Sequence, residues 1–149
     1  MILSTKGRYG LKAMFELALH YGDDPVSLNI IAEHQRISVN YLEQLIAPLR
    51  KKGLVVSARG AQGGYKLSRP PSEINVKDIL ETLEGPLTPS ACVGDGEDDS
   101  CFNADYCATR LIWEKIKESI DTVVTSITLA DMIADHARMH GNRQIEGRE

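Results

Sequence analysis

The chain has 149 residues, enough for one compact domain with a long appendage. No apolar run approaches the roughly 20 residues that span a bilayer, and the first residues lack the apolar core of a signal peptide, so a cytoplasmic protein with no membrane partner is predicted. The net charge of −4 is unevenly distributed, since residues 1–69 carry ten Lys and Arg against five Asp and Glu, and residues 70–149 carry seven against sixteen. The basic half is a candidate for contact with phosphates, although chance asymmetry in a soluble protein explains the same numbers equally well.

Three helices are predicted in the basic half. Apolar residues at three- and four-residue spacing predict the first helix from Lys6 to Tyr21. Ser27 and Ser38 are predicted N-caps of two further helices separated by a tight turn. Pro48 lies inside the third helical pattern, where it removes a backbone donor, so a kink or early unwinding is expected there.

A hairpin and a fourth helix follow. Residues 54–57 and 65–67 read as two strands joined by the glycine-rich turn 60–64, and Asn75 caps a short helix that ends at Gly85. Helices before and after a tight turn, followed by a hairpin, describe a winged helix-turn-helix. The predicted fold class is therefore mainly α with a small β-hairpin wing, with the DNA-binding domain spanning residues 1–87.

The acidic half begins with a polar, cysteine-bearing loop over residues 88–108. A long helix is predicted from Ala108 to Ser126, and Thr128 with Asp131 forms a capping box for a final short helix. Residues 109–137 are predicted to be the dimerisation helix and the terminal helix, and residues 138–149 a polar tail in which a protease-cleavage linker sequence occurs. Five apolar residues of the long helix follow a narrow heptad pattern that is typical of helices paired between chains, although packing on the chain's own domain is the alternative: Trp113, Ile116, Ile120, Val123 and Ile127.

In a winged helix-turn-helix, the second helix of the motif enters the major groove by its N-terminal end. Gln can pair with adenine and Glu can accept from cytosine, whereas basic residues hold the backbone and an Arg on a hairpin can probe the minor groove. An ordinary solvated helix face is the alternative for these side chains. The candidate DNA-binding residues are Ser38, Asn40, Tyr41, Glu43, Gln44, Arg50, Lys52 and Arg59.

Three cysteines, Cys92, Cys101 and Cys107, lie close together in the polar loop. An odd number in an intracellular chain argues against a disulfide framework. Three thiolates suit an iron–sulfur cluster or zinc, and the absence of a Cys-x-x-Cys knuckle makes structural zinc less favoured. Free thiols that sense oxidants rank lower, because the acidic run 95–99 is expected to raise thiol pKa values. Unligated loop cysteines are the remaining alternative.

Several motifs together resemble the IscR/CymR/NsrR family of winged-helix repressors. They are Ser4–Tyr9, Ile37-Ser38 with Tyr41–Leu45, Leu49–Lys51 with Gly53–Val55, Arg59-Gly60 with Gly63–Tyr65, and the segment from Cys92 to Cys107. The resemblance implies a homodimer on a pseudo-palindromic operator of double-stranded DNA. It also implies a metal site at the three cysteines that binds an iron–sulfur cluster, two-iron (2Fe-2S) in preference to four-iron (4Fe-4S), and base or groove contacts for Glu43, Gln44 and Arg59.

The chain departs from the family at the fourth cluster ligand. Arg110 stands where the IscR branch has a ligating His, and Arg8 where the nitric-oxide-sensing branch has an acidic ligand. An arginine stays protonated and cannot ligate iron. The fourth ligand is therefore unassigned, with Glu97, Asp105, a serine, water or a small thiol as candidates.

The predicted function is a non-enzymatic transcriptional regulator whose operator binding is controlled by the cluster. Ordering of residues 88–108 by the cluster is expected to fix the long helix and hence the spacing of the two reading helices. One alternative is a cluster-free regulator, like the CymR branch, that responds to a partner protein or to thiol state. Another is an iron–sulfur electron carrier, which leaves the wing and the Tyr41–Leu45 motif unexplained.

Overall fold

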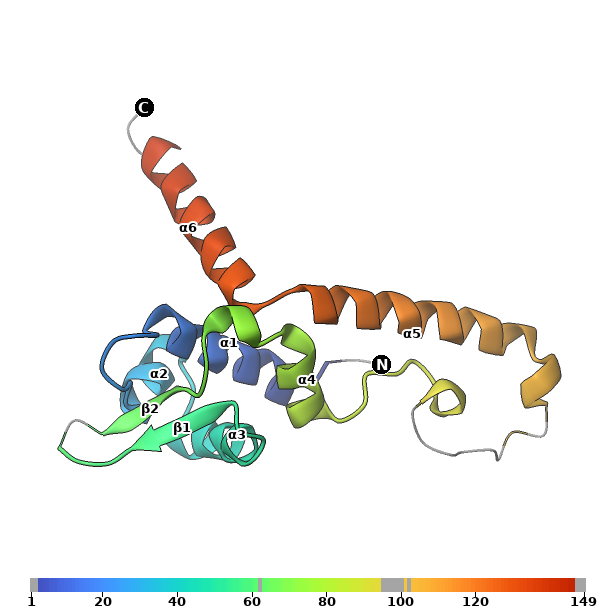
Figure 1. Ribbon diagram of the computed structural model, residues 1–149, viewed down its shortest axis with the longest axis horizontal. Helices are drawn as coiled ribbons and strands as arrows, with labels where there is room; N and C mark the ends of the chain where they lie inside the picture. The colour runs from blue at the N-terminus through green and yellow to red at the C-terminus, as the bar shows by residue number, and fades with distance from the viewer. Residues whose placement is uncertain (1–2, 62, 95–100, 102, 147–149) are drawn as a thin grey trace.

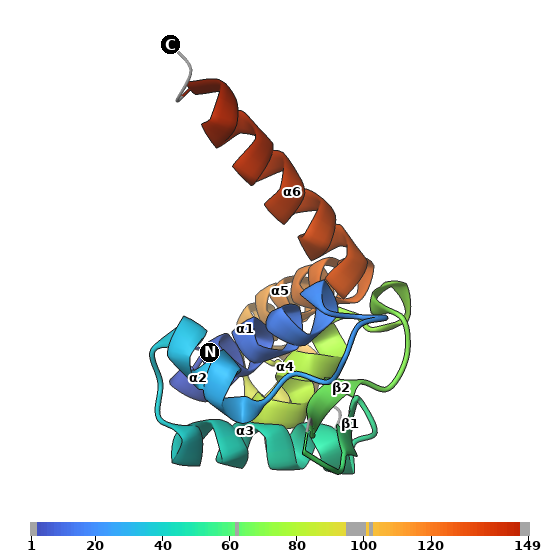
Figure 2. The same cartoon turned by 90° about the vertical axis from the view of Figure 1, so that its left-hand side faces the viewer.

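The computed structural model describes residues 3–61, 63–94, 101 and 103–146 (Figure 1). Four helices, α1 (Thr5–Leu19), α2 (Leu28–Gln35), α3 (Val39–Lys51) and α4 (Val76–Glu84), form a compact body with a hairpin of β1 (Val55–Ala58) and β2 (Gly64–Leu67). Two long helices, α5 (Ala108–Ser126) and α6 (Leu129–Glu146), project from this body in different directions (Figures 1 and 2). The predicted class, mainly α with a small hairpin wing, is confirmed, and α5 has the predicted bounds.

The predicted N-caps are present. The Ser27 and Ser38 hydroxyls accept from the backbone N–H groups of Ile30 and Tyr41 at 3.3 and 3.1 Å. The Asn75 side chain accepts from the N–H of Asp78 at 2.9 Å. Each bond satisfies one of the backbone donors that a helix start leaves without an intrahelical partner, and this fixes where α2, α3 and α4 begin.

The turn between α2 and α3 uses an arginine where a glycine is common. Arg36 has φ +56° and ψ +44°, in the left-handed region, and its N–H bonds back to the last turn of α2. A non-glycine residue in this region costs about 1–2 kcal/mol. Glu16 of α1, only 9% exposed, holds the end of α2 by accepting from His34 Nδ1 at 2.9 Å and Gln35 Nε2 at 3.4 Å. This anchorage offsets the strain of the turn.

The expected early unwinding at Pro48 is wrong. Helix α3 continues through Pro48 to Lys51, and the Pro48 carbonyl accepts from the N–H of Lys52 at 2.9 Å. The missing donor removes one intrahelical bond, but Leu45 and Leu49, on either side of the proline, are at most 1% exposed. Burial of these side chains, worth about 1.5–3 kcal/mol each, outweighs the lost bond.

The hairpin, called the wing below, comprises residues 55–67. Its strands pair antiparallel, with Val55 opposite Leu67 and Ala58 opposite Gly64. Tyr65 also exchanges two backbone hydrogen bonds with Val26, at 2.8 and 2.9 Å, which ties the wing to the start of α2. A Cβ on Gly64 would lie 2.4 Å from the Val26 carbonyl oxygen, so this close approach requires glycine.

The C-terminal helix is longer than predicted. The capping box is confirmed, since Thr128 N donates to Asp131 Oδ2 at 2.9 Å and Asp131 N donates to Thr128 Oγ1 at 3.2 Å. Leu129 is fully buried and its N–H bonds to the Ile74 carbonyl, so α6 starts from the core. From there α6 runs to Glu146, whereas a short helix and a polar tail beginning at residue 138 were expected. Many of its residues are good helix formers, and no proline interrupts it.

Candidate DNA-binding surface and cysteine segment

Helix α3, the second helix of the helix-turn-helix, has one polar, solvent-exposed face. Leu42 and Leu45 are buried in the core, and the candidate residues Ser38, Asn40, Glu43 and Gln44 are exposed. The apolar side chains therefore fix the rotation of α3, and that rotation turns hydrogen-bonding side chains toward solvent. The chemistry of this edge suits contact with base edges, because amide and carboxylate groups read donor and acceptor patterns.

Tyr41 differs from the other candidates in this set. It was expected among the exposed positions, but it is half-buried against α1. Its hydroxyl donates to Thr5 Oγ1 at 3.1 Å, and its ring packs edge-to-face on Tyr9 with centroids 6.2 Å apart. The side chain thus positions α3 on α1. Sequence reasoning missed Thr5, because no local pattern pairs residues 36 positions apart.

A groove of about 540 Å³ separates α3 from the wing. Its lining includes Glu43, Arg50, Lys51 and Tyr65, so basic side chains border it on the α3 side. Lys52 lies on a second groove, of about 560 Å³, between the end of α3 and α4, where Asp78 and Glu81 are also present. The carboxylates near Lys52 weaken the positive potential there, and Arg50 is the better placed of the two for a phosphate.

Arg59 lies at the tip of the wing directly after β1, and its side chain is exposed. The turn closes through the Gly63 N–H, which donates to the Gly60 carbonyl at 2.9 Å, and Gly60 has φ +116°. A slim hairpin with an arginine at its tip matches the shape of a narrow minor groove. Gln62, within the same turn, lies outside the described residues.

Replacing Arg59 with alanine is expected to weaken operator binding by about 1–3 kcal/mol, because a groove contact and a desolvated charge are lost together. Fluorescence-anisotropy titration with the operator measures the change. Lys66→Ala, an exposed lysine on β2 of the same wing, is the matched control. Equal losses for both variants would mean that Arg59 makes no groove contact of its own.

Replacing Lys52 with alanine is expected to weaken binding to all duplexes alike. A lysine that neutralises one phosphate releases about one counterion, so the slope of log affinity against log salt should become shallower by about one. Titrations at several salt concentrations, with operator and scrambled duplex, measure it. A loss confined to the operator would contradict a backbone role.

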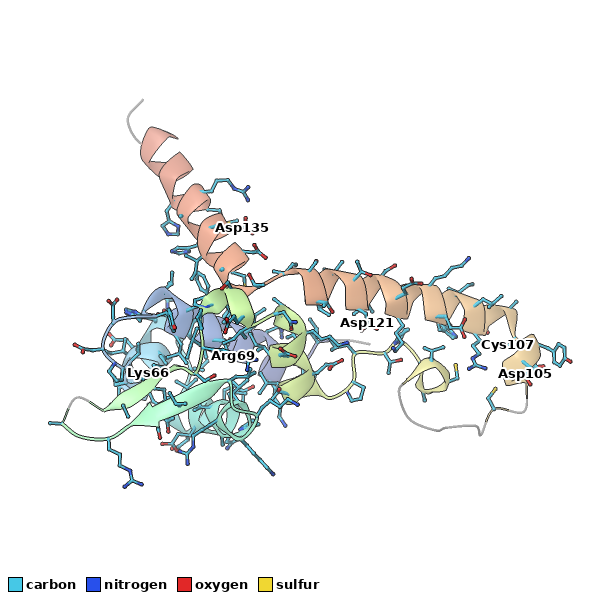
Figure 3. The ribbon with its side chains drawn as sticks, in the orientation of Figure 1. Lys66, Arg69, Asp105, Cys107, Asp121 and Asp135 are labelled. Atoms are coloured by element: carbon cyan, nitrogen blue, oxygen red, sulfur yellow. The ribbon has the colours of Figure 1, made fainter. Side chains whose placement is uncertain are left out.

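The cysteines lie on residues 88–107, called the cysteine segment below, which connects α4 to α5. Cys92 lies in a short 3-10 turn, η2 (Ala91–Val93), that packs against α5, and its Sγ is 3.3 Å from Ser90 Oγ. Cys107 precedes α5 directly, and Figure 3 shows it beside Asp105 at the end of α5 far from the body. Cys101 is exposed.

Cys107 lies among hydrogen-bonding groups at the start of α5. Its Sγ lies 2.9 Å from Thr109 Oγ1, and this bond, together with the backbone N–H groups of Arg110 and Thr109, lowers the pKa of the thiol below its usual value. Helix N-termini commonly stabilise thiolates in this way. The acidic run 95–99, which is expected to raise thiol pKa values, lies outside the described residues.

The three cysteines are not gathered around one centre in this structure. Over residues 3–61, 63–94, 101 and 103–146, no group of three His, Cys, Asp or Glu side chains is arranged to hold a metal ion. Arg110 and Glu114 line two shallow hollows, one bordered by Cys92 and the other by Cys107, and these two side chains pair at 3.5 Å. The thiol donors fit a cluster chemically, and binding one requires the segment to draw together. Of the fourth-ligand candidates, Asp105 is exposed beside Cys107 and Glu97 lies outside the described residues.

The predicted heptad residues of α5 divide into two groups. Ile120 and Ile127 pack against a buried cluster of the chain itself, formed by Val76, Leu80, Leu87 and Val124. Ile116 and Val123 are 38% and 55% exposed, and Ile112, one turn before Ile116, is 51% exposed. Trp113 is half-buried. Ile112, Ile116 and Val123 at spacings of four and seven form one apolar stripe, called the α5 ridge below.

Comparison with known proteins decides the family. The model of the Rrf2 family, described as an iron-dependent transcriptional regulator, matches residues 3–135. The chain belongs to the Rrf2 family. It is similar to the transcriptional regulator CymR of Bacillus subtilis, with 45% identity over 89% of both chains. It is also similar to IscR of Yersinia enterocolitica, with 41% identity over 89% of this chain and 79% of that protein.

Solved structures of Rrf2 proteins give the same picture. The structure of T. potens IscR has 52% sequence identity and a TM-score of 0.76, and covers 91% of this chain and 88% of its own. The structure of B. subtilis CymR has 43% sequence identity and the same TM-score of 0.76, and covers 90% of this chain and 97% of its own. This Rrf2 protein is thus a transcriptional regulator similar to both branches, which favours regulation over the electron-carrier alternative. In the described part of the chain, no helix is long and apolar enough to cross a membrane.

Proposed function

We propose that this Rrf2 protein is a homodimeric, operator-binding repressor whose DNA affinity is set by an iron–sulfur cluster held by Cys92, Cys101 and Cys107. The proposal rests on the position of the three thiols in the fold. They lie on the one segment that connects the DNA-binding body to the helix with an uncovered apolar ridge. A ligand bound there can act on both parts.

The DNA contact follows from the exposed edge of α3 and from the wing. Glu43 and Gln44 would meet base edges in the major groove, and Ser38 and Asn40 would contact the backbone at the helix start. Arg50, with Lys52, would neutralise phosphates, and Arg59 would enter the adjacent minor groove. The half-buried Tyr41 would position α3 instead of reading a base.

The α5 ridge would pair with the same ridge of a second copy. It is uncovered over Ile112, Ile116 and Val123, and exposed apolar residues in a row are typical of a protein interface. A two-fold axis through α5 would set two copies of α3 on successive major grooves, about 34 Å apart, on a pseudo-palindromic operator.

Cys92, Cys101 and Cys107 would hold the cluster, and a two-iron form is favoured over a four-iron form because of the similarity to IscR. When bound, the cluster supplies thiolate–iron bonds that break on oxidation or iron loss. Cys107 would contribute a thiol whose pKa is lowered at the start of α5, and Cys92 would bring η2 onto the same helix. The fourth ligand would be one of Asp105, Glu97, a serine, water and a small thiol.

Purification without oxygen tests the cofactor directly. Absorption and paramagnetic-resonance spectra, with iron, sulfide and zinc counted per chain, should show a cluster with about two iron and two sulfide per chain. The matched control is the Cys101→Ser variant, which should be colourless. A colourless, zinc-containing or metal-free wild-type protein would contradict the cluster.

A second candidate is a cluster-free regulator that responds to thiol state or to a partner protein, as in the CymR branch. Two observations favour it: the 45% identity to B. subtilis CymR and the lowered pKa of the Cys107 thiol, since thiolates react readily with oxidants. It predicts operator binding that changes with thiol oxidation in protein free of iron. The metal count separates the two candidates.

A further inference from the structure

Glu84, the last residue of α4, is bonded to the first turn of α1. Its Oε1 atom accepts from the Ser4 hydroxyl at 2.6 Å, the Gly7 N–H at 2.8 Å and the Ser4 N–H at 2.9 Å. A carboxylate is unfavourable at the C-terminal end of its own helix and favourable at the N-terminal end of another. The contact between α4 and α1 therefore stabilises the Glu84 carboxylate, because it places this group at the N-terminal end of α1.

Two glycines of α1 allow the close packing around Glu84. A Cβ on Gly7 would lie 2.5 Å from Glu84 Oε1, and one on Gly10 would lie 2.0 Å from Leu83 Cδ1, so two glycines allow α1 to approach the end of α4. The hydrogen bond from the Ser4 hydroxyl and those from the Gly7 and Ser4 N–H groups lower the pKa of Glu84, as does the charge of Lys6. The ionised form is thus the one that the first turn of α1 binds.

The same turn of α1 also contacts the recognition helix α3. Thr5, between Ser4 and Gly7 in sequence, accepts the hydroxyl hydrogen bond of Tyr41 at 3.1 Å. One turn further along α1, Tyr9 packs against the Tyr41 ring. The start of α1 therefore lies between the end of α4 and the first turns of α3.

On its other side, Glu84 leads directly into the cysteine segment. Gly85 ends α4 with φ +79°, and Leu87, 4% exposed, is buried in the cluster that α5 shares with α4. Cys92 follows five residues later, in η2 against α5. Leu87 directly precedes the cysteine segment, so a movement of the segment there would reach Glu84 through only Gly85 and Pro86.

We infer that Glu84 is a positioning residue that couples the cysteine segment to the DNA-reading helix within one chain, by holding the first turn of α1 against Tyr41. The inference rests on the proposed function for its regulatory meaning. The coupling it describes does not depend on the dimer. It runs from the cysteine segment to Glu84, through the hydrogen bonds of Glu84 with Ser4 and Gly7, and from the neighbouring Thr5 to Tyr41. Glu84 itself touches neither DNA nor the cysteines.

A double-mutant cycle in metal-free full-length protein tests this coupling. Glu84→Ala and Tyr41→Phe should each weaken operator binding about tenfold, and the double variant should bind no more weakly than the worse single variant, because both break one chain of contacts. Glu73→Ala, which removes an exposed carboxylate from the turn before α4, is the matched control and should bind like the wild type. If the fold-loss of operator affinity in the double variant equalled the product of the two single losses, the inference would be overturned. Glu84→Gln, which keeps an oxygen acceptor, should show a smaller loss and serves if the alanine variant does not fold.

Hydrogen exchange supplies a readout that needs neither DNA nor a cluster. In Glu84→Ala, amides of residues 5–9 and of residues 38–42 should both exchange faster, and in Glu73→Ala neither should change. Faster exchange at residues 5–9 alone would show a local capping role and overturn the coupling. If the wild type bound no operator, the proposed function would fail, while the exchange experiment would still decide whether Glu84 connects α4 to α3.

Discussion

Replacing Ile116 and Val123 together with glutamate is expected to give a monomeric protein whose operator affinity is about 10²–10⁴-fold lower. Two reading helices on one dimer bind two half-sites with a high effective concentration, and a monomer loses this advantage. Both side chains are already exposed in the single chain, so the substitution should leave the fold intact. Charges facing each other across a two-fold axis would then prevent pairing.

Sedimentation velocity and operator titration measure the two effects separately. Thr125→Glu is the control, because Thr125 is exposed on α5 half a helix turn away from the ridge. It should remain dimeric and keep its operator affinity. A double variant that still sediments as a dimer would place the interface elsewhere, and a monomer with undiminished operator affinity would contradict dimeric reading.

Replacing Cys92 with alanine is expected to abolish cluster binding and with it any difference in operator affinity between anaerobically reconstituted and iron-free protein. For the wild type, that difference should lie in the range of about 5–150-fold that is typical of coupling between sites. The physical reason is that, in the proposed site, Cys92 would be the ligand on η2, the turn that packs against α5. Without Cys92, only two cysteine ligands would remain, and η2 would have no bond to the proposed cluster.

The control for this prediction is Ser119→Ala. This variant loses an exposed hydroxyl on α5 that donates to the Lys115 carbonyl and keeps all three thiols, so it should retain iron and the affinity difference. The readouts are iron per chain and the ratio of the two operator affinities. An affinity difference that persists in Cys92→Ala would separate regulation from the proposed cluster site.

Local patterns predicted most of the fold. The caps at Ser27, Ser38 and Asn75 and the bounds of α5 follow from side chains that act within one helical turn. Pro48 was judged by its local cost, and the prediction failed because burial on both sides of it outweighs one lost hydrogen bond. The sequence predicts too short an α6, because a polar composition favours fraying but does not by itself end a helix.

The candidate site was less accessible to sequence reasoning, because its key contacts join distant residues. The Glu84–Ser4 bonds span 80 positions and the Tyr41–Thr5 bond spans 36, and no periodicity encodes either. The heptad of α5 was seen, but which of its members face the chain itself depends on where Leu80 and Leu87 lie. The ligand set of the cysteines depends on how the segment closes, which spacing does not determine.

Selection of bound sequences from random duplex DNA by the anaerobically purified protein tests the central claim most directly, since that claim is that two copies of α3 read one operator. The selected duplexes should share a two-fold symmetric site, with half-sites separated by about one helical turn, or 10–10.5 base pairs. Native mass spectrometry of the complex should show two chains on one duplex. Recovery of sequences without a shared site, or of a single asymmetric half-site bound by one chain, would contradict the account.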